Sequence, residues 1–306
     1  MQIVSRLTAL VLAGLPCIAS AIAGEFVKIP WNGDYPHNNE RTWSKDYELG
    51  WSRSFMNGTP QEKGIVKREG VLNAEIYQPK SDGPQPYIVL MHGCAGMDSN
   101  TKKWASEYAD FFQRQGLGVL VLDSFTTRGV KESCGKPDGH WGRRRSEDAY
   151  SALDYLVARK DADRARVFLL GRSNGGLATV MALEDVMAKH HANKFAMGFA
   201  LVPACRGKIT ANFYAPLFIF SAGQDDANPA EKCVELAKHE RQAGHSTVKT
   251  IIYRAALHGY MDRVPPHRFH GWRMGFNEPT AKDTLRTIAS FLQLEQPPIK
   301  SGVEFR

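Results

Sequence analysis

Val167-Phe168-Leu169-Leu170-Gly171-Arg172-Ser173-Asn174-Gly175 places a serine between two glycines, directly behind a continuous apolar run. The apolar run predicts a buried strand, and the apolar residues 176–183 that follow predict a buried helix. Glycines two residues to either side of Ser173 allow the sharp turn that exposes a nucleophilic hydroxyl between a strand and a helix. The pentapeptide alone is a weak signal, and a glycine-rich loop with an incidental serine is the alternative. The strand before it and the helix after it favour the nucleophile.

The chain on both sides of this turn alternates between short apolar runs and helical patterns. Buried strands are expected at 87–91, 118–122, 167–170, 196–202, 216–221 and 248–253, and a hairpin with its turn near 69–70 is expected over 64–79. Helices are expected around 104–115, from a cap at Ser146, from Asn228-Pro229 to Gly244, and over 280–294. This alternation predicts the α/β class, with a mostly parallel eight-stranded sheet covered by helices on both faces. Functional side chains are then expected beyond the C-terminal ends of the strands.

The first 23 residues have the pattern of an export signal. Arg6 is followed by an apolar stretch over 7–19 and by Ala21-Ile22-Ala23, a small-x-small cleavage site. We therefore expect a periplasmic or secreted protein, with a retained N-terminal anchor as the alternative. No later stretch is long enough to cross a bilayer, so no stable membrane insertion is expected. The aromatic-rich residues 24–63 are expected to form an irregular arm over a main domain of 64–306.

The charge balance does not indicate a nucleic-acid partner. The 306 residues carry a formal net charge of +7, and the short basic run Arg143-Arg144-Arg145 is not accompanied by a pattern of stacking aromatic residues. We interpret that run as a solvated loop, with attraction of anionic substrates as the alternative. The sequence does not indicate an oligomeric state.

Four cysteines follow the export signal: Cys94, Cys134, Cys205 and Cys233. An even number in an exported chain favours two disulfides, and free buried thiols are the alternative. Three connectivities are possible. The short-range pairs 94–134 and 205–233 are expected if the strands that precede their members are neighbours in the sheet.

A serine hydroxyl needs a base to accept its proton and a third group to orient that base. His258 is the candidate base because it follows the last expected strand by a few residues. His267 and His270 are its closest rivals. The histidines on helices or at helix ends are expected to face solvent: His190, His191, His239 and His245.

The orienting acid is expected after the strand 216–221, where Asp225 and Asp226 are both candidates. We favour Asp225, because the strand end aims it inward and leaves Asp226 nearer the next helix. The chain order Ser173, Asp225, His258 is the order expected on a sheet of this kind.

An oxyanion formed on the substrate needs donors that are already in place. One is expected to be the backbone amide of Asn174, at the start of a helix. The other is expected to be the backbone amide of Cys94, in the loop His92-Gly93-Cys94-Ala95-Gly96 that follows an early strand. A reactive Cys94 thiol is the competing interpretation, which a disulfide to Cys134 would exclude. His92 is expected to support this loop.

The sequence does not indicate a metal or a cofactor. His190 and His191 are adjacent and point in different directions on a helix. Neither the zinc-binding spacings nor a glycine-rich phosphate loop occurs.

Five motifs in order resemble the dienelactone hydrolase family of α/β-hydrolases over about residues 64–294: the HGCAG loop from His92, Asp123–Gly129, Gly171–Gly176, Gly223-Gln224-Asp225 with Pro229, and Leu257–Tyr260. The resemblance implies the α/β-hydrolase fold. It favours Asp225, which lies four residues before Pro229, and implies a strand order that brings together the pairs Cys94–Cys134 and Cys205–Cys233. Ser173 departs from the family's namesake enzymes, which use cysteine. The insertion 261–278 lies outside the matched core and directly follows His258, where it is able to cover a pocket.

Together these observations predict an exported serine hydrolase of a small-molecule carboxylic ester or lactone. Arg128 and Arg172 are expected to bind a substrate carboxylate, and Arg172 has the alternative of bracing the turn. An amidase or peptidase with the same triad remains open, as does a binding protein without activity on the same scaffold.

Overall fold

The computed structural model describes residues 24–32, 69–79, 81–135, 142–205, 212–245 and 247–293. Its centre is an eight-stranded sheet. In spatial order the strands are β1 (Glu25–Asn32), β2 (Glu69–Tyr77), β4 (Gly118–Asp123), β3 (Gln85–Met91), β5 (Ala162–Arg172), β6 (Met197–Leu201), β7 (Leu217–Ala222) and β8 (Val248–Tyr253). β2 is antiparallel to both of its neighbours, and the strands from β4 to β8 run parallel. The predicted mostly parallel eight-stranded sheet is confirmed.

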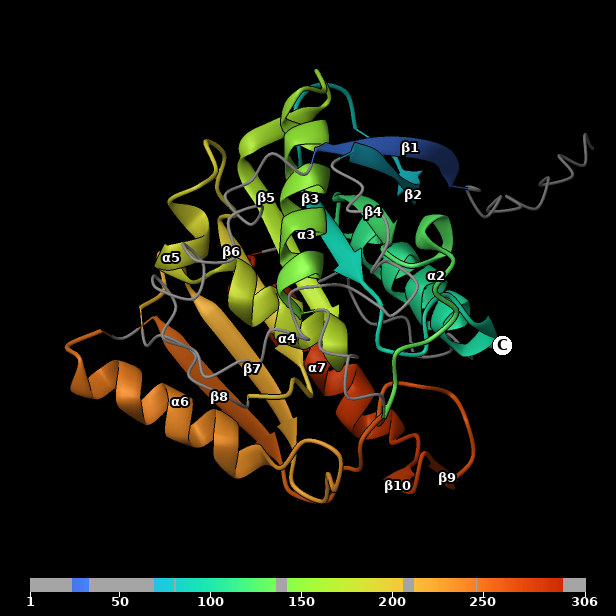
Figure 1. Ribbon diagram of the computed structural model, residues 1–306, viewed down its shortest axis with the longest axis vertical. Coiled ribbons are helices and arrows are strands. Elements are labelled where there is room, and N and C mark those ends of the chain that lie inside the picture. The colour runs from blue at the N-terminus through green and yellow to red at the C-terminus, as the bar shows by residue number, and fades with distance from the viewer. Residues whose placement is uncertain are drawn as a thin grey trace, which may run out of the picture.

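Helices cover both faces of the sheet (Figure 1). One face carries α3 (Gly142–Val157), α4 (Asn174–Ala182), the short α5 (Asp185–Ala188) and α6 (Ala230–Gln242); the other carries α2 (Ser99–Arg114) and α7 (Glu278–Phe291). Each parallel strand contributes alternate side chains to two cores: Val89 and Met91 pack under α3 and α4, whereas Ile88 and Leu90 pack under α2 and α7. Burial on both faces explains why these strands are continuously apolar in the sequence.

The N-terminal edge of the sheet differs from the prediction. β2 is one uninterrupted strand that pairs with β1, so the hairpin expected over 64–79 is wrong, as is the irregular arm for residues 25–32. β1 buries Ile29 and Trp31 and exposes Lys28 and Pro30, which is the period of a strand with one buried face. The strand contains Pro30, which its position at the edge of the sheet tolerates. The remainder of the expected arm and the export signal lie outside the described residues.

Helix α3 begins at Gly142, four residues before the cap expected at Ser146. Ser146 lies inside the helix, where its buried hydroxyl donates to the carbonyls of Gly142 (2.7 Å) and Ala178 (2.9 Å). A Cβ on Gly142 would lie 2.9 Å from Leu177 Cγ, so α3 and α4 cross closely here. Gly142 and Ser146, which lie one turn apart in α3, thus serve this crossing rather than a cap.

Two further expectations about exposure are wrong. Arg145 does not belong to a solvated loop, because it lies in α3 and its side chain is fully buried. His191 is buried as well: its ring stacks on Tyr150 at a centroid distance of 3.6 Å, and its Nε2 lies 3.2 Å from Glu147 Oε2. His239 and His245 are exposed, as predicted.

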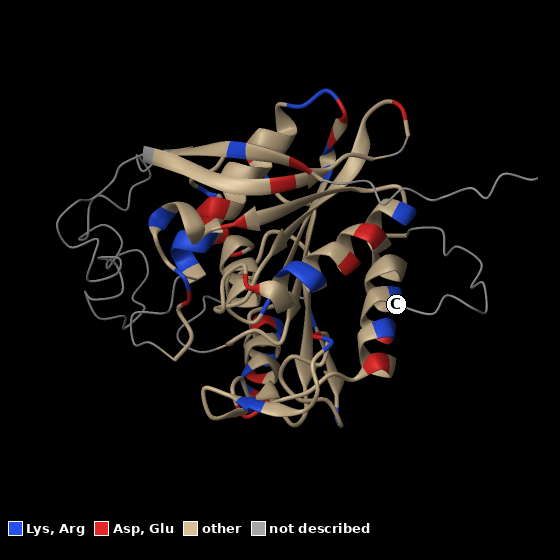
Figure 2. Cartoon of the chain, turned by 90° about the vertical axis from the view of Figure 1, so that its right-hand side faces the viewer, with Lys and Arg blue, Asp and Glu red and all other residues tan. Residues whose placement is uncertain are grey.

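Basic and acidic residues are interspersed over the elements seen in Figure 2. None of the helices in the described part of the chain combines the length and the apolar character that a bilayer span requires.

Candidate active site

The turn between β5 and α4 places strain on Ser173 itself. Its backbone has φ 52° and ψ −115°, a conformation that a residue with a side chain adopts at a cost. The flanking glycines are needed for close packing rather than for positive φ: a Cβ on Gly171 would lie 2.1 Å from Gly175 O, and a Cβ on Gly175 would lie 2.4 Å from Met91 O. The strand, the turn and the helix can approach this closely only when both positions lack side chains.

Ser173, His258 and Asp225 form a continuous chain of hydrogen bonds. His258 Nε2 lies 3.0 Å from Ser173 Oγ, and His258 Nδ1 lies 2.7 Å from Asp225 Oδ2. Because a carboxylate accepts, Nδ1 carries the proton and Nε2 is left to accept from the serine hydroxyl. Asp225 Oδ1 accepts from the amides of Ala227 (2.9 Å) and Asn228 (2.8 Å), which fixes the carboxylate. His258 and Asp225 are both buried.

Each member of this chain follows the C-terminal end of a different parallel strand. Ser173 follows β5, Asp225 follows β7, and His258 follows β8. Asp226 is not part of the arrangement: it accepts from the backbone amide (2.9 Å) and Nε (3.3 Å) of Arg273. The sequence offered both aspartates as partners of His258. In the structure, Asp225 contacts this histidine and Asp226 does not.

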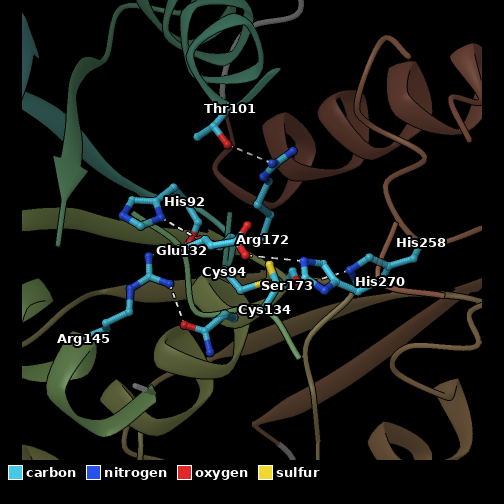
Figure 3. The surroundings of a disulfide bond; sticks show 12 residues. His92, Cys94, Thr101, Glu132, Cys134, Arg145, Arg172, Ser173, His258 and His270 are labelled. Carbon is cyan, nitrogen blue, oxygen red and sulfur yellow. Dashed lines mark hydrogen bonds and ion pairs between the residues drawn. A yellow bond between two sulfur atoms is a disulfide. The ribbon is translucent and has the colours of Figure 1, made fainter. Parts of the chain in front are cut away.

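The loop after β3 lies beside Ser173 (Figure 3). His92 is buried; its Nδ1 donates to the Gly93 carbonyl (2.7 Å) and its Nε2 accepts from the Ser124 amide (3.3 Å). Burial, together with the nearby Arg145 cation, holds the pKa of His92 well below its usual range, so the ring is neutral. His92 thus supports the loop, as the sequence suggested.

Both disulfides that the resemblance implied are present. Cys94 is bonded to Cys134, which excludes a free reactive thiol at Cys94, and Cys205 is bonded to Cys233. In each case the strands before the two cysteines are neighbours: β3 beside β4, and β6 beside β7. The Cys94 carbonyl also accepts from the Ser133 amide at 2.8 Å, so two links join the loop after β3 to the loop after β4.

A cavity of about 70 Å³ opens onto Ser173 and His258. One wall comes from the insertion 261–278, which contains the hairpin of β9 (His267–Phe269) and β10 (Trp272–Met274). The insertion contributes mainly apolar side chains to this wall: Met261, Val264, Phe269, Trp272 and Met274. His267 also lines the cavity, but its Nδ1 donates to the Pro265 carbonyl, and His270 pairs with Glu132; neither contacts Ser173.

The two arginines expected to bind a substrate carboxylate are both engaged by the protein. Arg172 lines the cavity, forms an ion pair with Asp262, and donates to Thr101 Oγ1 (3.1 Å). Burial lowers the pKa of Arg172 to about 10. Arg128 lies away from the cavity, where its guanidinium makes a bidentate contact of 2.7 Å with Asp148. Arg172 therefore ties the turn to the insertion, and Arg128 is not placed to meet a substrate.

The sequence offered no specific signal for two further residues at the site. Arg145 appeared only as part of a basic run, and its acceptors come from distant segments. Asp262 was one acidic residue in an insertion of unknown position. Within the described residues, no group of three or more His, Cys, Asp or Glu side chains is arranged to hold a metal ion.

Comparison with known proteins agrees with this architecture. Residues 104–208 match the prolyl oligopeptidase family of peptidases. Dipeptidyl peptidase family member 6 of Caenorhabditis elegans is 31% identical over 101 residues, 33% of this chain and 13% of that protein. A protein of Bacillus subtilis named as a hydrolase, YtaP, is 29% identical over 129 residues, 35% of this chain and 42% of that protein. The chain thus spans less than half the length of both curated relatives.

Solved structures cover much more of the chain. A Klebsiella pneumoniae protein assigned as a dienelactone hydrolase superposes with a TM-score of 0.58 at 15% identity, covering 73% of this chain and 93% of that one. Esterase 2 of Thermogutta terrifontis with bound butyrate superposes with a TM-score of 0.55 at 16% identity, covering 74% and 90%. At these identities the likeness establishes the fold. The chain therefore has the α/β-hydrolase fold that its sequence predicted, and this fold is similar to that of the Klebsiella protein assigned as a dienelactone hydrolase.

Proposed function

We propose that this protein is a serine hydrolase that cleaves a carboxylic ester or lactone through an acyl-enzyme. The observation that carries the proposal is the hydrogen-bonded chain from Asp225 through His258 to Ser173. A serine is held in a strained turn, an imidazole nitrogen is in contact with its hydroxyl, and a buried carboxylate fixes the imidazole.

In this mechanism Ser173 Oγ attacks the carbonyl carbon while His258 Nε2 takes the hydroxyl proton. The electron pair of the carbonyl moves onto its oxygen, which the backbone amides of Asn174 and Cys94 stabilise. The tetrahedral intermediate collapses and expels the alcohol, which receives the proton from His258. Water then repeats the sequence on the acyl-enzyme, releases the acid, and restores the serine.

The favoured substrate is uncharged and small. Arg172 is the cation at the cavity, and Asp262 balances its charge; Asp98 adds a further carboxylate to the lining. The apolar wall of the insertion suits an alkyl or aryl group. The volume of the cavity suits a short acyl chain. Butyrate, which has such a chain, is bound to esterase 2 of T. terrifontis.

We further propose that the protein functions outside the cytoplasm, in the periplasm or as a secreted enzyme. Two disulfides are typical of proteins from oxidising compartments, and residues 1–23 have the pattern of an export signal.

A peptidase or amidase with the same triad is the second candidate, because residues 104–208 match the prolyl oligopeptidase family. The two functions are separated by comparing p-nitrophenyl butyrate with the matched amide, butyryl p-nitroanilide. We expect kcat/KM for the ester to exceed that for the anilide by at least ~100-fold, and Ser173→Ala to lower ester turnover by roughly 10⁴-fold or more without changing Tm. An anilide hydrolysed as fast as the ester would favour the peptidase, and undiminished turnover in Ser173→Ala would rule out both.

A further inference from the structure

Arg145 is a buried cation that joins two separate parts of the site. Its side chain is fully buried on α3 and lies on the opposite side of Cys94 and Ser173 from His258 (Figure 3). Nη2 donates to the His92 carbonyl at 2.5 Å, and Nη1 donates to Asn174 Oδ1 at 2.7 Å. The first acceptor belongs to the loop after β3, and the second belongs to the residue that follows Ser173.

Both acceptors are uncharged, and the nearby carboxylates of Asp148 and Asp123 stabilise the cation electrostatically without accepting these two hydrogen bonds. Burial lowers the pKa of Arg145 to about 9, which still leaves the side chain protonated at neutral pH. Its guanidinium packs over the Phe125 ring at 5.1 Å, and that ring in turn meets His92 edge-on at 4.7 Å. The planar fork of an arginine is thus held in one orientation, with its two ends directed at two different segments.

The contact between Arg145 and His92 also affects the peptide that joins Gly93 to Cys94, whose N–H is one of the proposed oxyanion donors. His92 Nδ1 donates to the Gly93 carbonyl, and that carbonyl belongs to the same planar peptide as the Cys94 amide. Fixing the carbonyl at one end of a peptide fixes the direction of the N–H at its other end. Arg145 therefore anchors the residue that orients the Cys94 amide, and it also anchors Asn174, whose amide is the other proposed oxyanion donor.

We propose that Arg145 is a positioning residue of the oxyanion hole, which holds the Cys94 and Asn174 amides in register by bridging the His92 carbonyl and the Asn174 side chain. This inference rests on the proposed hydrolase function and goes beyond it, because neither the triad nor the amides themselves require a buried cation behind them.

The test is Arg145→Lys, which keeps the charge but cannot span both acceptors with a planar fork. For p-nitrophenyl butyrate we expect kcat to fall by roughly 10- to 100-fold, less than the 10²–10³-fold typical of deleting a donor outright, with KM within about 2-fold. A trifluoromethyl ketone forms a tetrahedral adduct with the serine and places its oxygen anion in the hole. Its affinity should weaken by the same factor as kcat/KM, whereas the affinity for butyrate should not change.

Tyr150→Phe is the matched control. It removes a buried hydrogen bond of 2.8 Å to the Ala182 carbonyl from the same helix, without touching His92 or Asn174. We expect a lower Tm and a kcat within about 2-fold of wild type. An equal loss of kcat in Tyr150→Phe and Arg145→Lys would overturn the positioning role, as would an unchanged kcat in Arg145→Lys.

If Arg145→Lys does not fold, Asn174→Ala takes its place, because it removes one acceptor of Arg145 and keeps the Asn174 amide. For Asn174→Ala we expect kcat and the affinity for the trifluoromethyl ketone to fall by ~3- to 10-fold, with KM unchanged. An unchanged kcat in this variant would overturn the proposal. The proposed hydrolase function fails separately, through activity that persists in Ser173→Ala.

Discussion

Asp225 and Asp226 are adjacent after β7, but their carboxylates are bound by different elements. Asp225 is buried and is held by two backbone amides and by His258. Asp226 reaches the hairpin of the insertion, where it binds Arg273. In the turn that follows β7 the two carboxylates are directed to different partners, and only that of Asp225 faces the histidine.

This difference predicts opposite outcomes for two conservative substitutions. Asp225→Asn should lower kcat/KM for p-nitrophenyl butyrate by about 10³- to 10⁴-fold, because an amide no longer enforces the Nδ1–H tautomer of His258. Asp226→Asn should change it by less than ~3-fold, since it alters only a surface contact with Arg273. Equal losses in the two variants would contradict the assignment of the orienting acid.

At the residue scale, the sequence predicted side chains that sit in a recognisable local pattern. Ser173 has its flanking glycines, and His258 has its place after the last strand of the sheet. Arg145 and His191 have no such pattern, because burial of a polar side chain depends on partners that are distant in the chain. A short basic run has the same composition whether its members face solvent or a carbonyl of another segment.

Among the elements, the loops at the C-terminal ends of the strands carry the site, and the two disulfides differ in what they hold. Cys94–Cys134 ties the loop beside Ser173 to the loop after β4. Cys205–Cys233 ties the loop after β6 to α6. Cys205 and Cys233 do not line the cavity.

Removal of each disulfide should therefore have a different effect on activity. The sequence separations are 40 and 28 residues, so the chain-entropy model gives each bond a similar contribution of about 4 kcal/mol to the free energy of unfolding. Cys94→Ala/Cys134→Ala should lower this free energy and also lower kcat by about 10-fold, because the Cys94 amide loses its brace. Cys205→Ala/Cys233→Ala should lower the free energy alone.

Urea unfolding and ester kinetics on both double variants check this prediction. If both double variants lost the same free energy of unfolding and both retained the wild-type kcat, the Cys94–Cys134 disulfide would have no role in activity.

The parallel strands β3, β4, β7 and β8 were predicted well, including β8 at the edge of the sheet, whereas β1 and the start of α3 were not. β8 was predicted with its observed bounds, and β3, β4 and β7 differ from their predicted ranges by one or two residues at their ends. β1 was missed because its residues were interpreted as part of an irregular, aromatic-rich arm, whereas its pairing partner β2 lies far along the chain and begins only at Glu69. The start of α3 was missed because the requirement for glycine at position 142 comes from its contact with α4, which a local sequence pattern does not show.

At the scale of the whole molecule, the position of the site follows from a parallel sheet with helices on both faces. Such a sheet brings the ends of distant strands to one edge, and there the insertion 261–278 completes the cavity. The sequence predicted the sheet and, through the family resemblance, the two disulfides. The ion pair between Arg172 and Asp262, which links the turn to the insertion, required the three-dimensional structure.

The proposed function requires Ser173 to act as a nucleophile that His258 activates. The most direct measurement is reaction of the folded protein with a fluorophosphonate probe, followed by mass spectrometry of the peptides. We predict a single adduct on Ser173, absent in Ser173→Ala and formed at least ~100-fold more slowly in His258→Ala. A folded wild-type protein that remains unlabelled, or that carries the adduct on another residue, would contradict it.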